Sequence, residues 1–335
     1  MTLNPMIRDL HDPARLPDPT DSVGVVQTHI SIVFVADAFV YKVKKPVNFG
    51  FLDFSTLEKR KFYCHREVEL NRRLSRGLYM DVLPVTLQGG IHTLRETVGE
   101  PMDYAVRMRR IPDDRLMKSL FARGDITDGH LRKIAEVVAG FHAKAATSPE
   151  IAAFGESERF KVNTDENFEQ IRKYIGTTVT ENQFQSLKAW TESFYQSNQG
   201  LFAERIAQGR IRDCHGDLHM EHVCLTEDLP IFDCIEFNDR FRYSDTIADI
   251  AFLLMDLEYH GGEDLAQNLW HYYKNLAHED DAEDLLVFYK VYRAVVRGKV
   301  NGFQVDDPSI RGPEKEMAIQ TAQKYFQLAA SYTGE

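Results

Sequence analysis

The feature that most constrains the fold is a change of pattern near residue 108. Before it, short runs rich in β-branched and aromatic residues alternate with turn residues, whereas after it apolar residues recur at helical spacing. A chain of 335 residues is long enough for two hydrophobic cores. We therefore predict an α+β fold with two parts, a strand-rich unit over residues 1–108 and a mainly helical unit over residues 109–335.

The first unit is expected to contain a small antiparallel sheet and one helix. Apolar runs place the strands at residues 23–26, 30–35, 39–43, 80–87 and 102–108. The helix should cover residues 56–74, because Ser55 and Glu58 are spaced as a capping box. The first 20 residues contain four prolines and are expected to be irregular.

The second unit is expected to be helical, with one interruption. Helical periodicity covers residues 131–145, 167–175, 184–208 and 246–260, and it continues beyond residue 263. The interruption is the segment IRDCHGDLHMEHVCL, followed by LPIFDCIEF. Its short apolar runs on both sides of a turn predict a hairpin inserted into the helical unit.

This hairpin concentrates polar side chains that suit phosphoryl transfer. They are His215, Asp217, His219, Glu221, His222, Asp233 and Glu236. Phosphoryl transfer needs a carboxylate near the attacking hydroxyl and metal ligands near the phosphates. In kinases a metal ligand follows the base by five positions, and a second one follows a short hairpin. Asp217, His222 and Asp233 have this spacing, although such carboxylates also serve simply to cap turns.

HGDLHMEHV and IFDCIEF resemble the catalytic loop and the metal-binding strand of the aminoglycoside phosphotransferase and choline kinase superfamily. From about Val23 onward, the chain is similar to an uncharacterised bacterial branch of aminoglycoside-phosphotransferase-like proteins. The resemblance implies a bilobal protein-kinase-like fold with an N-terminal nucleotide-binding lobe and a C-terminal acceptor lobe. It further implies that Asp217 is the catalytic base, that Asp233 is the main Mg²⁺ ligand and that His215 organises the loop.

Residue 222 departs from the pattern of that superfamily, which usually has Asn where this chain has His222. An imidazole can bind a metal, but Mg²⁺ prefers oxygen ligands. Weaker Mg²⁺ binding, use of Mn²⁺ and reduced activity are all compatible with this substitution.

A lysine that contacts phosphate and its acidic partner are expected in the first unit. Strand alternation places Lys42 and Lys44 on one face and Lys45 on the other. We favour Lys42, with Lys44 as the alternative. As the partner on the following helix we favour Glu67 over Glu69, because Glu67 shares its face with apolar residues.

No glycine-rich loop or P-loop motif is present to cover the phosphates. The turn Thr28–Ser31 can supply backbone N–H groups and the Ser31 hydroxyl, but it also fits a plain β-turn. Met108 is included among the nucleotide-binding residues.

Asp245 and Asp249 are interpreted as caps of an apolar helix, and in the resembled family an Asp near this position also supports the catalytic loop.

The sequence thus predicts a small-molecule kinase that uses ATP and Mg²⁺, or Mn²⁺, with its hydroxyl acceptor bound among helices between Asn163 and Phe202. The first alternative is a nucleotide-binding pseudokinase or regulatory protein. A metal-dependent hydrolase is a weaker alternative because neither HExxH nor HxxEH is present. The sequence identifies neither the acceptor nor the oligomeric state, and it does not distinguish ATP from GTP.

Charge and composition restrict the partners. A net charge of −11 argues against a nucleic-acid surface. No stretch approaches the ~20 apolar residues of a membrane helix. We expect a cytoplasmic protein whose four cysteines are reduced and mostly buried.

Overall fold

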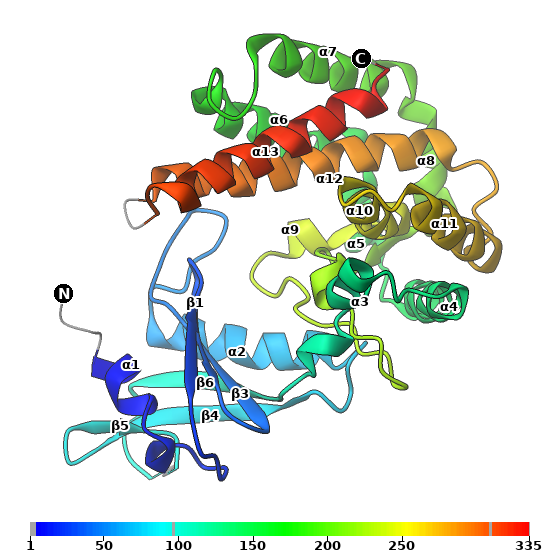
Figure 1. Cartoon of the computed structure of the whole chain (residues 1–335). Helices are drawn as coiled ribbons and strands as arrows, with labels where there is room; N and C mark the ends of the chain where they lie inside the picture. Colours follow the sequence, from blue (N-terminus) through cyan, green and yellow to red (C-terminus); the bar gives the residue numbers. More distant parts are fainter. Residues whose placement is uncertain (1–4, 96–97, 308–309, 335) are drawn as a thin grey trace. The chain divides into compact units, whose positions relative to one another are not determined.

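The computed structural model describes residues 5–95, 98–307 and 310–334. These residues form two compact units, shown in Figure 1. One contains the chain up to Asp125 together with Glu221–Asp239, and the other contains Ile126–Met220 and the chain from Arg240 onward. The predicted α+β class is confirmed. The sequence-based division at residue 108, between a nucleotide-binding part and an acceptor-binding part, stays a prediction.

The first unit is built on a six-stranded sheet in the order β1-β2-β3-β6-β4-β5, with every neighbouring pair antiparallel. The strands are β1 (Gly24–Gln27), β2 (Ser31–Val35), β3 (Phe39–Lys44), β4 (Tyr79–Gln88), β5 (Ile91–Thr93) and β6 (Asp103–Arg109). All five predicted strands are present. The short β5 was not predicted, because three residues carry too little alternation to be recognised.

The two faces of this sheet have different roles. On one face, Tyr41 and Val43 of β3 join a hydrophobic cluster with residues of β2, β6 and α1. The alternate residues Lys42 and Lys44 therefore lie on the other face. Helix α2 (Leu57–Asn71) packs against β4 and β6. Val68 of this helix lies in a second apolar cluster with Val106 of β6.

The start of α2 differs from the prediction by one residue. Its N-cap is Thr56, whose hydroxyl accepts a hydrogen bond from the Lys59 amide at 3.3 Å. The Ser55 hydroxyl donates instead to Asp53, which also accepts the Ser55 amide. Ser55 and Thr56 are both good capping residues, so the sequence did not decide between them.

The prediction that the first 20 residues are irregular is wrong for part of this segment. Residues Pro5–Leu10 form the helix α1, and Pro13–Arg15 form a short 3₁₀ turn. Leu10 and Leu16 are buried in the same hydrophobic cluster as Tyr41 and Val43 of the sheet. Pro5 stands at the first helical position, where proline is tolerated, so the prolines were a weaker signal than the apolar residues between them.

The second unit is mainly helical. Its main helices are α4 (Asp128–Lys144), α6 (Ser157–Ile171), α7 (Glu181–Ser197), α8 (Gln199–Ala207), α10 (Thr246–Tyr259), α11 (Glu263–Ala277), α12 (Glu283–Phe303) and α13 (Pro313–Tyr332). Short helices lie at α5 (Pro149–Ala152) and α9 (Asp239–Arg242), and α3 (Met117–Arg123) belongs to the first unit. The single helix predicted over residues 184–208 is divided into α7 and α8 at Asn198, whose side chain caps the Phe194 carbonyl.

The predicted hairpin is present in part. Val223 and Ile231 form an antiparallel bridge across the turn. The short strand β7 (Ile211–Asp213), however, pairs with β8 (Tyr243–Asp245) within the second unit. The segment therefore divides after Met220, and its two halves belong to different units.

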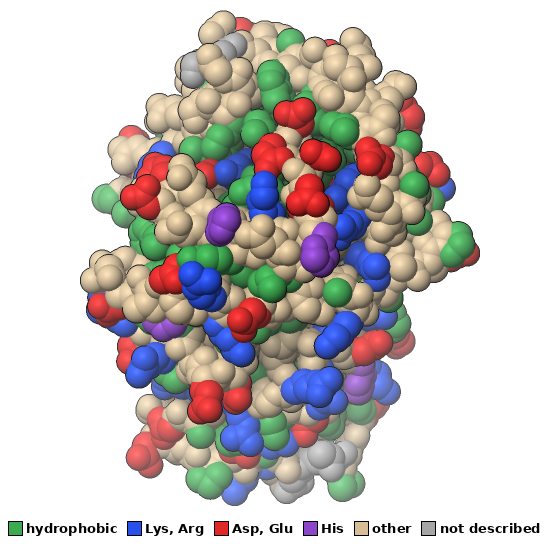
Figure 2. All heavy atoms as spheres, turned by 90° about the vertical axis from the view of Figure 1, so that its right-hand side faces the viewer, with side chains coloured by type: hydrophobic (Ala, Val, Ile, Leu, Met, Phe, Trp, Pro, Cys, Tyr) green, Lys and Arg blue, Asp and Glu red, His purple; other side chains and the backbone are tan. Residues whose placement is uncertain are grey.

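The cysteines agree with the expectation from the sequence, and the face shown in Figure 2 carries charges of both signs. Figure 2 shows acidic and basic side chains interspersed over the face that it presents. Cys64, Cys214, Cys224 and Cys234 are free and buried. Among the helices of the described ranges, none combines the length and the hydrophobicity required to cross a membrane.

The long helices α12 and α13 lie side by side in Figure 1, and a glycine permits their close approach. A Cβ atom added to Gly298 of α12 would lie 2.8 Å from the Phe326 ring of α13. We predict that Gly298→Ala lowers the free energy of unfolding by about 1–3 kcal/mol through overpacking. Urea unfolding followed by circular dichroism measures this change.

Gly140 in α4 is the matched control, because an added Cβ would meet no atom within 4 Å there. Gly140→Ala should stabilise the protein by about 0.5–1 kcal/mol through helix propensity. Equal stabilisation by both substitutions would contradict the packing argument.

Candidate active site

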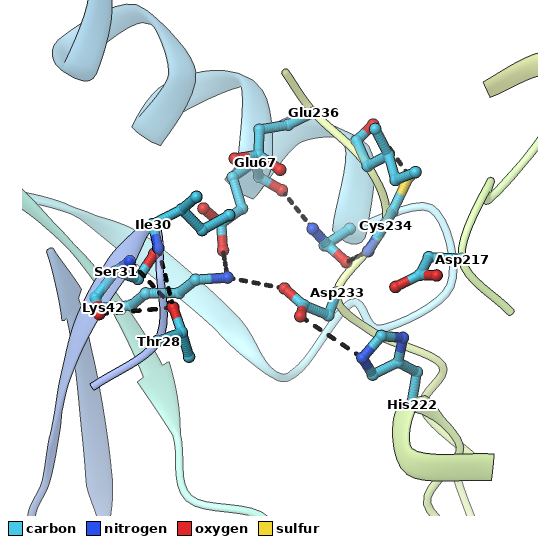
Figure 3. A network of polar contacts seen from close by, with 12 residues as sticks. Thr28, Ile30, Ser31, Lys42, Glu67, Asp217, His222, Asp233, Cys234 and Glu236 are labelled. Carbon is cyan, nitrogen blue, oxygen red and sulfur yellow. Dashed lines mark hydrogen bonds and ion pairs between the residues drawn. The ribbon is translucent and has the colours of Figure 1, made fainter. Parts of the chain in front are cut away.

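Two lysines of β3 meet one carboxylate of α2 in the first unit, and Figure 3 shows Lys42 and Glu67 of this group. The Lys42 ammonium lies 3.0 Å from Glu67 Oε1, and the Lys44 ammonium lies 2.6 Å from Glu67 Oε2. Glu67 is fully buried. Glu69, the other candidate partner, is 70% exposed and lies near Arg66. Of the two candidate carboxylates, the structure thus brings Glu67 to the lysines.

Lys44 is enclosed by a second carboxylate. Its ammonium also bonds to Glu236, which lies three residues after Asp233. The side chain of Lys44 is 1% exposed, whereas that of Lys42 is 15% exposed. The two lysines therefore differ in accessibility although they share a face and a partner.

The electrostatics of this cluster hold its lysines in the charged form. Burial alone would lower the pKa of Lys42, but Asp233 and Glu67 outweigh it and hold the pKa well above its usual value. Burial likewise opposes the charge of Lys44, and Glu236 and Glu67 raise its pKa. For Glu67, burial is outweighed by Lys42 and Lys44, so that its pKa is lowered. Burial raises the pKa of Glu236 despite Lys44, and the nearby Glu67 adds to this.

Asp233 completes the group on the side of Lys42. Its Oδ1 atom accepts a hydrogen bond from the Lys42 ammonium at 2.7 Å, and its side chain is 42% exposed. The backbone of Asp233 has a φ of +61°, a left-handed conformation that Asp tolerates better than most residues. The Tyr79 hydroxyl accepts from the Asp233 amide at 3.2 Å, and Asn71 Oδ1 accepts from the next amide, that of Cys234, at 2.9 Å.

His222 lies beside Asp233 in the same unit. Its Nε2 atom is 3.5 Å from Asp233 Oδ2, and its carbonyl accepts the Phe232 amide at 3.0 Å across the hairpin. The hairpin thus brings together the two residues that the sequence predicted as metal ligands. A hard carboxylate with an adjacent imidazole can bind a divalent cation of mixed oxygen and nitrogen preference.

The predicted phosphate-contacting turn is pre-ordered by its own side chain. The Thr28 hydroxyl accepts from the amides of Ile30 and Ser31 at 3.3 and 3.0 Å, as Figure 3 shows. Ser31 pairs with Lys44 in the sheet and is 1% exposed. Its hydroxyl makes no hydrogen bond to any described residue.

Met108 lies half-buried on β6, paired in register with Val40 and Tyr79.

In the second unit, the loop that carries Asp217 is anchored by Asp249 of α10. Its two carboxylate oxygens accept from the backbone amides of His215 and Gly216 at 2.7 and 2.8 Å. His215 Nδ1 in turn accepts from the Asp217 amide at 3.3 Å. The predicted role of His215 as a loop organiser stays a prediction. The Asp217 carboxylate is 33% exposed, with His219 Nε2 at 3.5 Å.

Asp249 is fully buried and charged. Burial alone would raise its pKa, but the hydrogen bond and the charge of His142, together with His215 and Arg293, hold the pKa well below its usual range. Arg293 also donates to the Gly216 carbonyl at 2.9 Å. Asp245, by contrast, caps α10 through the Ile247 amide and pairs with Arg205. Asp245 is thus the helix cap and Asp249 the support of the loop.

Sequence reasoning missed several contributors. Asn71 and Tyr79 hold the backbone around Asp233, and Asp256 holds the Met220 amide at 3.0 Å. Asn71 lies one helical turn after Glu67, which is a usable signal because both residues then share a face. Tyr79 and Asp256 carry no such signal in the sequence.

The family of the chain follows from a match to residues 63–285, which fit the model described as the phosphotransferase enzyme family. The chain belongs to that family. Uncharacterised proteins of Mycobacterium tuberculosis and Mycobacterium bovis are 36% identical to it over 279 residues, which are 83% of this chain and 54% of theirs. The chain therefore spans about half the length of these curated relatives.

Solved structures confirm the predicted bilobal protein-kinase-like fold. A choline/ethanolamine kinase family protein from Mesorhizobium loti has a TM-score of 0.51 and 13% identity, covering 94% of this chain and 92% of its own. A protein of Ralstonia eutropha assigned to the aminoglycoside phosphotransferases has a TM-score of 0.52 and 11% identity, covering 93% and 92%. At these identities the likeness shows the fold alone.

We predict that Lys44→Met lowers the free energy of unfolding by about 3–5 kcal/mol, because Glu236 then remains buried beside Glu67 without its cation. Adding Glu236→Gln should recover part of the loss. Urea unfolding measures both changes. Lys59→Met is the control, since Lys59 pairs with Asp53 at the surface and should cost at most about 1 kcal/mol. A Lys44→Met loss as small as that of the control would contradict the prediction.

Asp249→Asn should lower stability at pH 7 by about 2–3 kcal/mol, because charge-assisted bonds to the loop are lost. The folded pKa of Asp249 lies below the unfolded value of 3.8, so its contribution is present above that value and is lost as the pH falls. The variant should therefore lose less stability than the wild type between pH 5 and pH 2. Asp264→Asn, at an exposed position of α11, serves as the control; parallel acid profiles for wild type and Asp249→Asn would refute the assignment.

Proposed function

We propose that the chain is an ATP-dependent phosphotransferase that moves the γ-phosphoryl group to a hydroxyl group of a small molecule. The observation that carries this proposal is the position of the Lys42 ammonium, 3.0 Å from Glu67 and 2.7 Å from Asp233. A fixed cation next to a metal-binding carboxylate suits the charges of a nucleoside triphosphate. Membership of the phosphotransferase enzyme family supports the same reaction class.

Lys42 is the proposed phosphate-contacting lysine. Its side chain retains 15% exposure and lies next to Asp233, whereas Lys44 is 1% exposed and is enclosed by Glu67 and Glu236. A lysine that must reach a ligand needs an accessible ammonium group. Lys44 is better suited to hold the two carboxylates in place.

Asp233 and His222 would hold the metal ion, which would offset negative charge on the phosphates. The donors fit a divalent cation, because Asp233 offers an exposed carboxylate and His222 offers a ring nitrogen at 3.5 Å from it. An oxygen and a nitrogen donor together suit Mn²⁺ at least as well as Mg²⁺.

Asp217 is the proposed base. In this mechanism the acceptor hydroxyl oxygen forms a bond to the γ-phosphorus, the bond from that phosphorus to the β,γ-bridging oxygen breaks, and ADP leaves. The hydroxyl proton passes to the Asp217 carboxylate. The anchored loop supports this role, since Asp249 and His215 fix the backbone on both sides of Gly216. Transfer is direct and has no phospho-enzyme intermediate.

The second candidate is a nucleotide-binding pseudokinase, which is favoured by one observation. His222 provides an imidazole at a position where an oxygen donor would suit Mg²⁺ better. A pseudokinase would bind nucleotide and transfer no phosphoryl group to any acceptor.

Asp217→Asn tests the catalytic proposal. We expect kcat for phosphoryl transfer to fall by about 10²–10⁴-fold with ADP affinity unchanged, because only the proton acceptor is lost. A coupled assay of ADP release across sugars, aminoglycosides, amino alcohols and nucleosides measures turnover, and calorimetric titration with ADP measures binding. Asp228→Asn, an exposed carboxylate in the hairpin turn, is the control. Binding of nucleotide by the wild type without turnover on the whole panel would favour the pseudokinase.

His222→Asn tests the metal site. Replacing the imidazole by an amide oxygen should lower the Mg²⁺ concentration for half-maximal activity or nucleotide binding and raise the preference for Mg²⁺ over Mn²⁺. Titrations of both ions against wild type and variant supply the measurement. His271→Asn, on α11, is the matched control. An unchanged Mg²⁺/Mn²⁺ ratio would remove His222 from the set of ligands.

A further inference from the structure

Arg297 of α12 differs from the buried arginines of the second unit because its guanidinium group lacks an acidic partner. Arg205 forms ion pairs with two carboxylates, and Arg293 donates to two backbone carbonyl groups. The side chain of Arg297 makes one hydrogen bond to the described residues, from its Nε atom to the Tyr325 hydroxyl at 3.4 Å. No acidic side chain among these residues forms an ion pair with it.

The two terminal nitrogens of this group, Nη1 and Nη2, are available to a ligand. Arg297 is partly exposed. Both nitrogens lack a hydrogen-bond partner among the described residues, and neither is one of the buried polar atoms that lack one, so both remain accessible to solvent. A guanidinium group presents its N–H donors as a planar fork that fits the two oxygens of a carboxylate or phosphate group. Arg297 therefore offers an open fork for an anion.

Tyr325 of α13 holds the Arg297 side chain in position. The guanidinium carbon lies 5.6 Å from the centre of the Tyr325 ring, and the hydroxyl of the same residue accepts from Nε. The ring is itself fixed, because it is buried and stacks on Tyr259 with 3.7 Å between the ring centres. A group that is oriented before binding loses less conformational freedom when a ligand arrives. The fork is thus open and also preorganised.

The loop that carries Asp217 lies beside this part of α12, and both belong to the second unit. Arg293, one helical turn before Arg297, donates to the Gly216 carbonyl at 2.9 Å. Side chains four residues apart lie on the same face of a helix, so Arg297 continues the face that Arg293 turns toward the loop. The open fork therefore lies near the carboxylate of Asp217.

The charges of this region agree with that position. Burial alone would lower the pKa of Arg297, but Tyr325 and the carboxylates of Asp217 and Asp256 raise it. The two carboxylates are close enough for their charges to act on Arg297, although neither forms an ion pair with it. An anionic group placed next to Asp217 would be repelled by that carboxylate, and Arg297 supplies a positive charge that opposes the repulsion.

We propose that Arg297 binds an anionic group, a carboxylate or a phosphate, of the molecule whose hydroxyl group is phosphorylated at Asp217. The acceptor is then a hydroxy acid, a sugar acid or a sugar phosphate rather than an amine. The inference rests on the proposed function, which supplies the hydroxyl acceptor and the base. It names the class of acceptor, which the fold alone does not determine.

A simpler role for Arg297 is that of a counter-charge to Asp217 and Asp256. A counter-charge would affect every acceptor alike, because it acts on the protein and not on the ligand. A residue that binds an anionic group instead discriminates between acceptors that differ in that group alone. Acceptors of this kind therefore separate the two roles.

Matched pairs of acceptors test the proposal on the full chain with ATP and Mn²⁺. The pairs are D-glucose with D-glucuronate, glycerol with D-glycerate, and glycerol with glycerol 3-phosphate, and choline and kanamycin are the cationic probes. In at least one pair, kcat/KM of the wild type should be about 10–100-fold higher for the anionic member, the gain expected from charge-assisted hydrogen bonds. The two glycerol pairs distinguish a carboxylate from a phosphate.

Arg297→Met should lower this anionic-to-neutral ratio of kcat/KM by about 10–100-fold, mainly through KM, because the lost contact is to a part of the acceptor that does not react. Arg297→Lys should retain part of the ratio, since it keeps the charge and loses the fork. Arg159→Met is the matched control, because Arg159 is exposed on α6 with its guanidinium carbon 5.6 Å from the Phe154 ring. Melting temperatures verify the fold of each variant. An equal loss for both members of a pair would identify a counter-charge and overturn the proposal.

Calorimetric titration of the anionic probes in the presence of ADP and Mn²⁺ separates this proposal from the proposed function. Binding that depends on Arg297, without phosphoryl transfer to any probe, would refute the kinase proposal and retain the anion site. Transfer to a neutral or cationic probe that exceeds transfer to every anionic one would retain the kinase and overturn the anion site.

Two further results would overturn the anion site. The first is failure of every anionic probe to bind. The second is that Arg297→Met weakens binding of β,γ-imido-ATP but not of ADP and leaves the anionic-to-neutral ratio unchanged. The fork would then serve the γ-phosphate of the nucleotide rather than the acceptor.

Discussion

The buried ion cluster of Lys42, Lys44, Glu67 and Glu236 is the interaction on which the geometry of the first unit depends. It connects three segments that are far apart in sequence: strand β3, helix α2 and the end of the hairpin segment. Removing each charge from water is costly, and only the opposite charges compensate for it. The two lysines and the two glutamates therefore stabilise one another only when all four charges are present. Together they hold the Lys42 ammonium beside Asp233.

The parts of the site that follow local periodicity could be predicted from sequence. Strand alternation placed Lys42 and Lys44 on one face, and helical spacing selected Glu67 over Glu69. The structure has both arrangements. The strands of the sheet were predictable for the same reason, because each is long enough for alternation to be visible, with β5 as the exception.

The remaining parts depend on contacts between distant segments, which no local pattern encodes. Asn71 and Tyr79 reach the backbone at residues 233 and 234 only because α2 and β4 pack beside the hairpin. Local pattern alone made Asp249 a helix cap, and only the family resemblance pointed to an Asp near this position as a support of the loop. The bond from the His215 amide to Asp249 depends on how α10 packs beside the loop. The same limit explains α1, since burial of Ile7 and Leu10 rather than the presence of Pro5 determines its structure.

The left-handed backbone of Asp233 restricts which sequences can occupy this position. Asn and Gly adopt that conformation at little cost, whereas alanine or a β-branched residue adds backbone strain of about 1–3 kcal/mol. A copy of this protein that no longer needed the proposed metal ligand would therefore still be restricted at this position. Its accessible replacements are the two residues that keep the turn, so loss of the carboxylate would leave the hairpin around it intact.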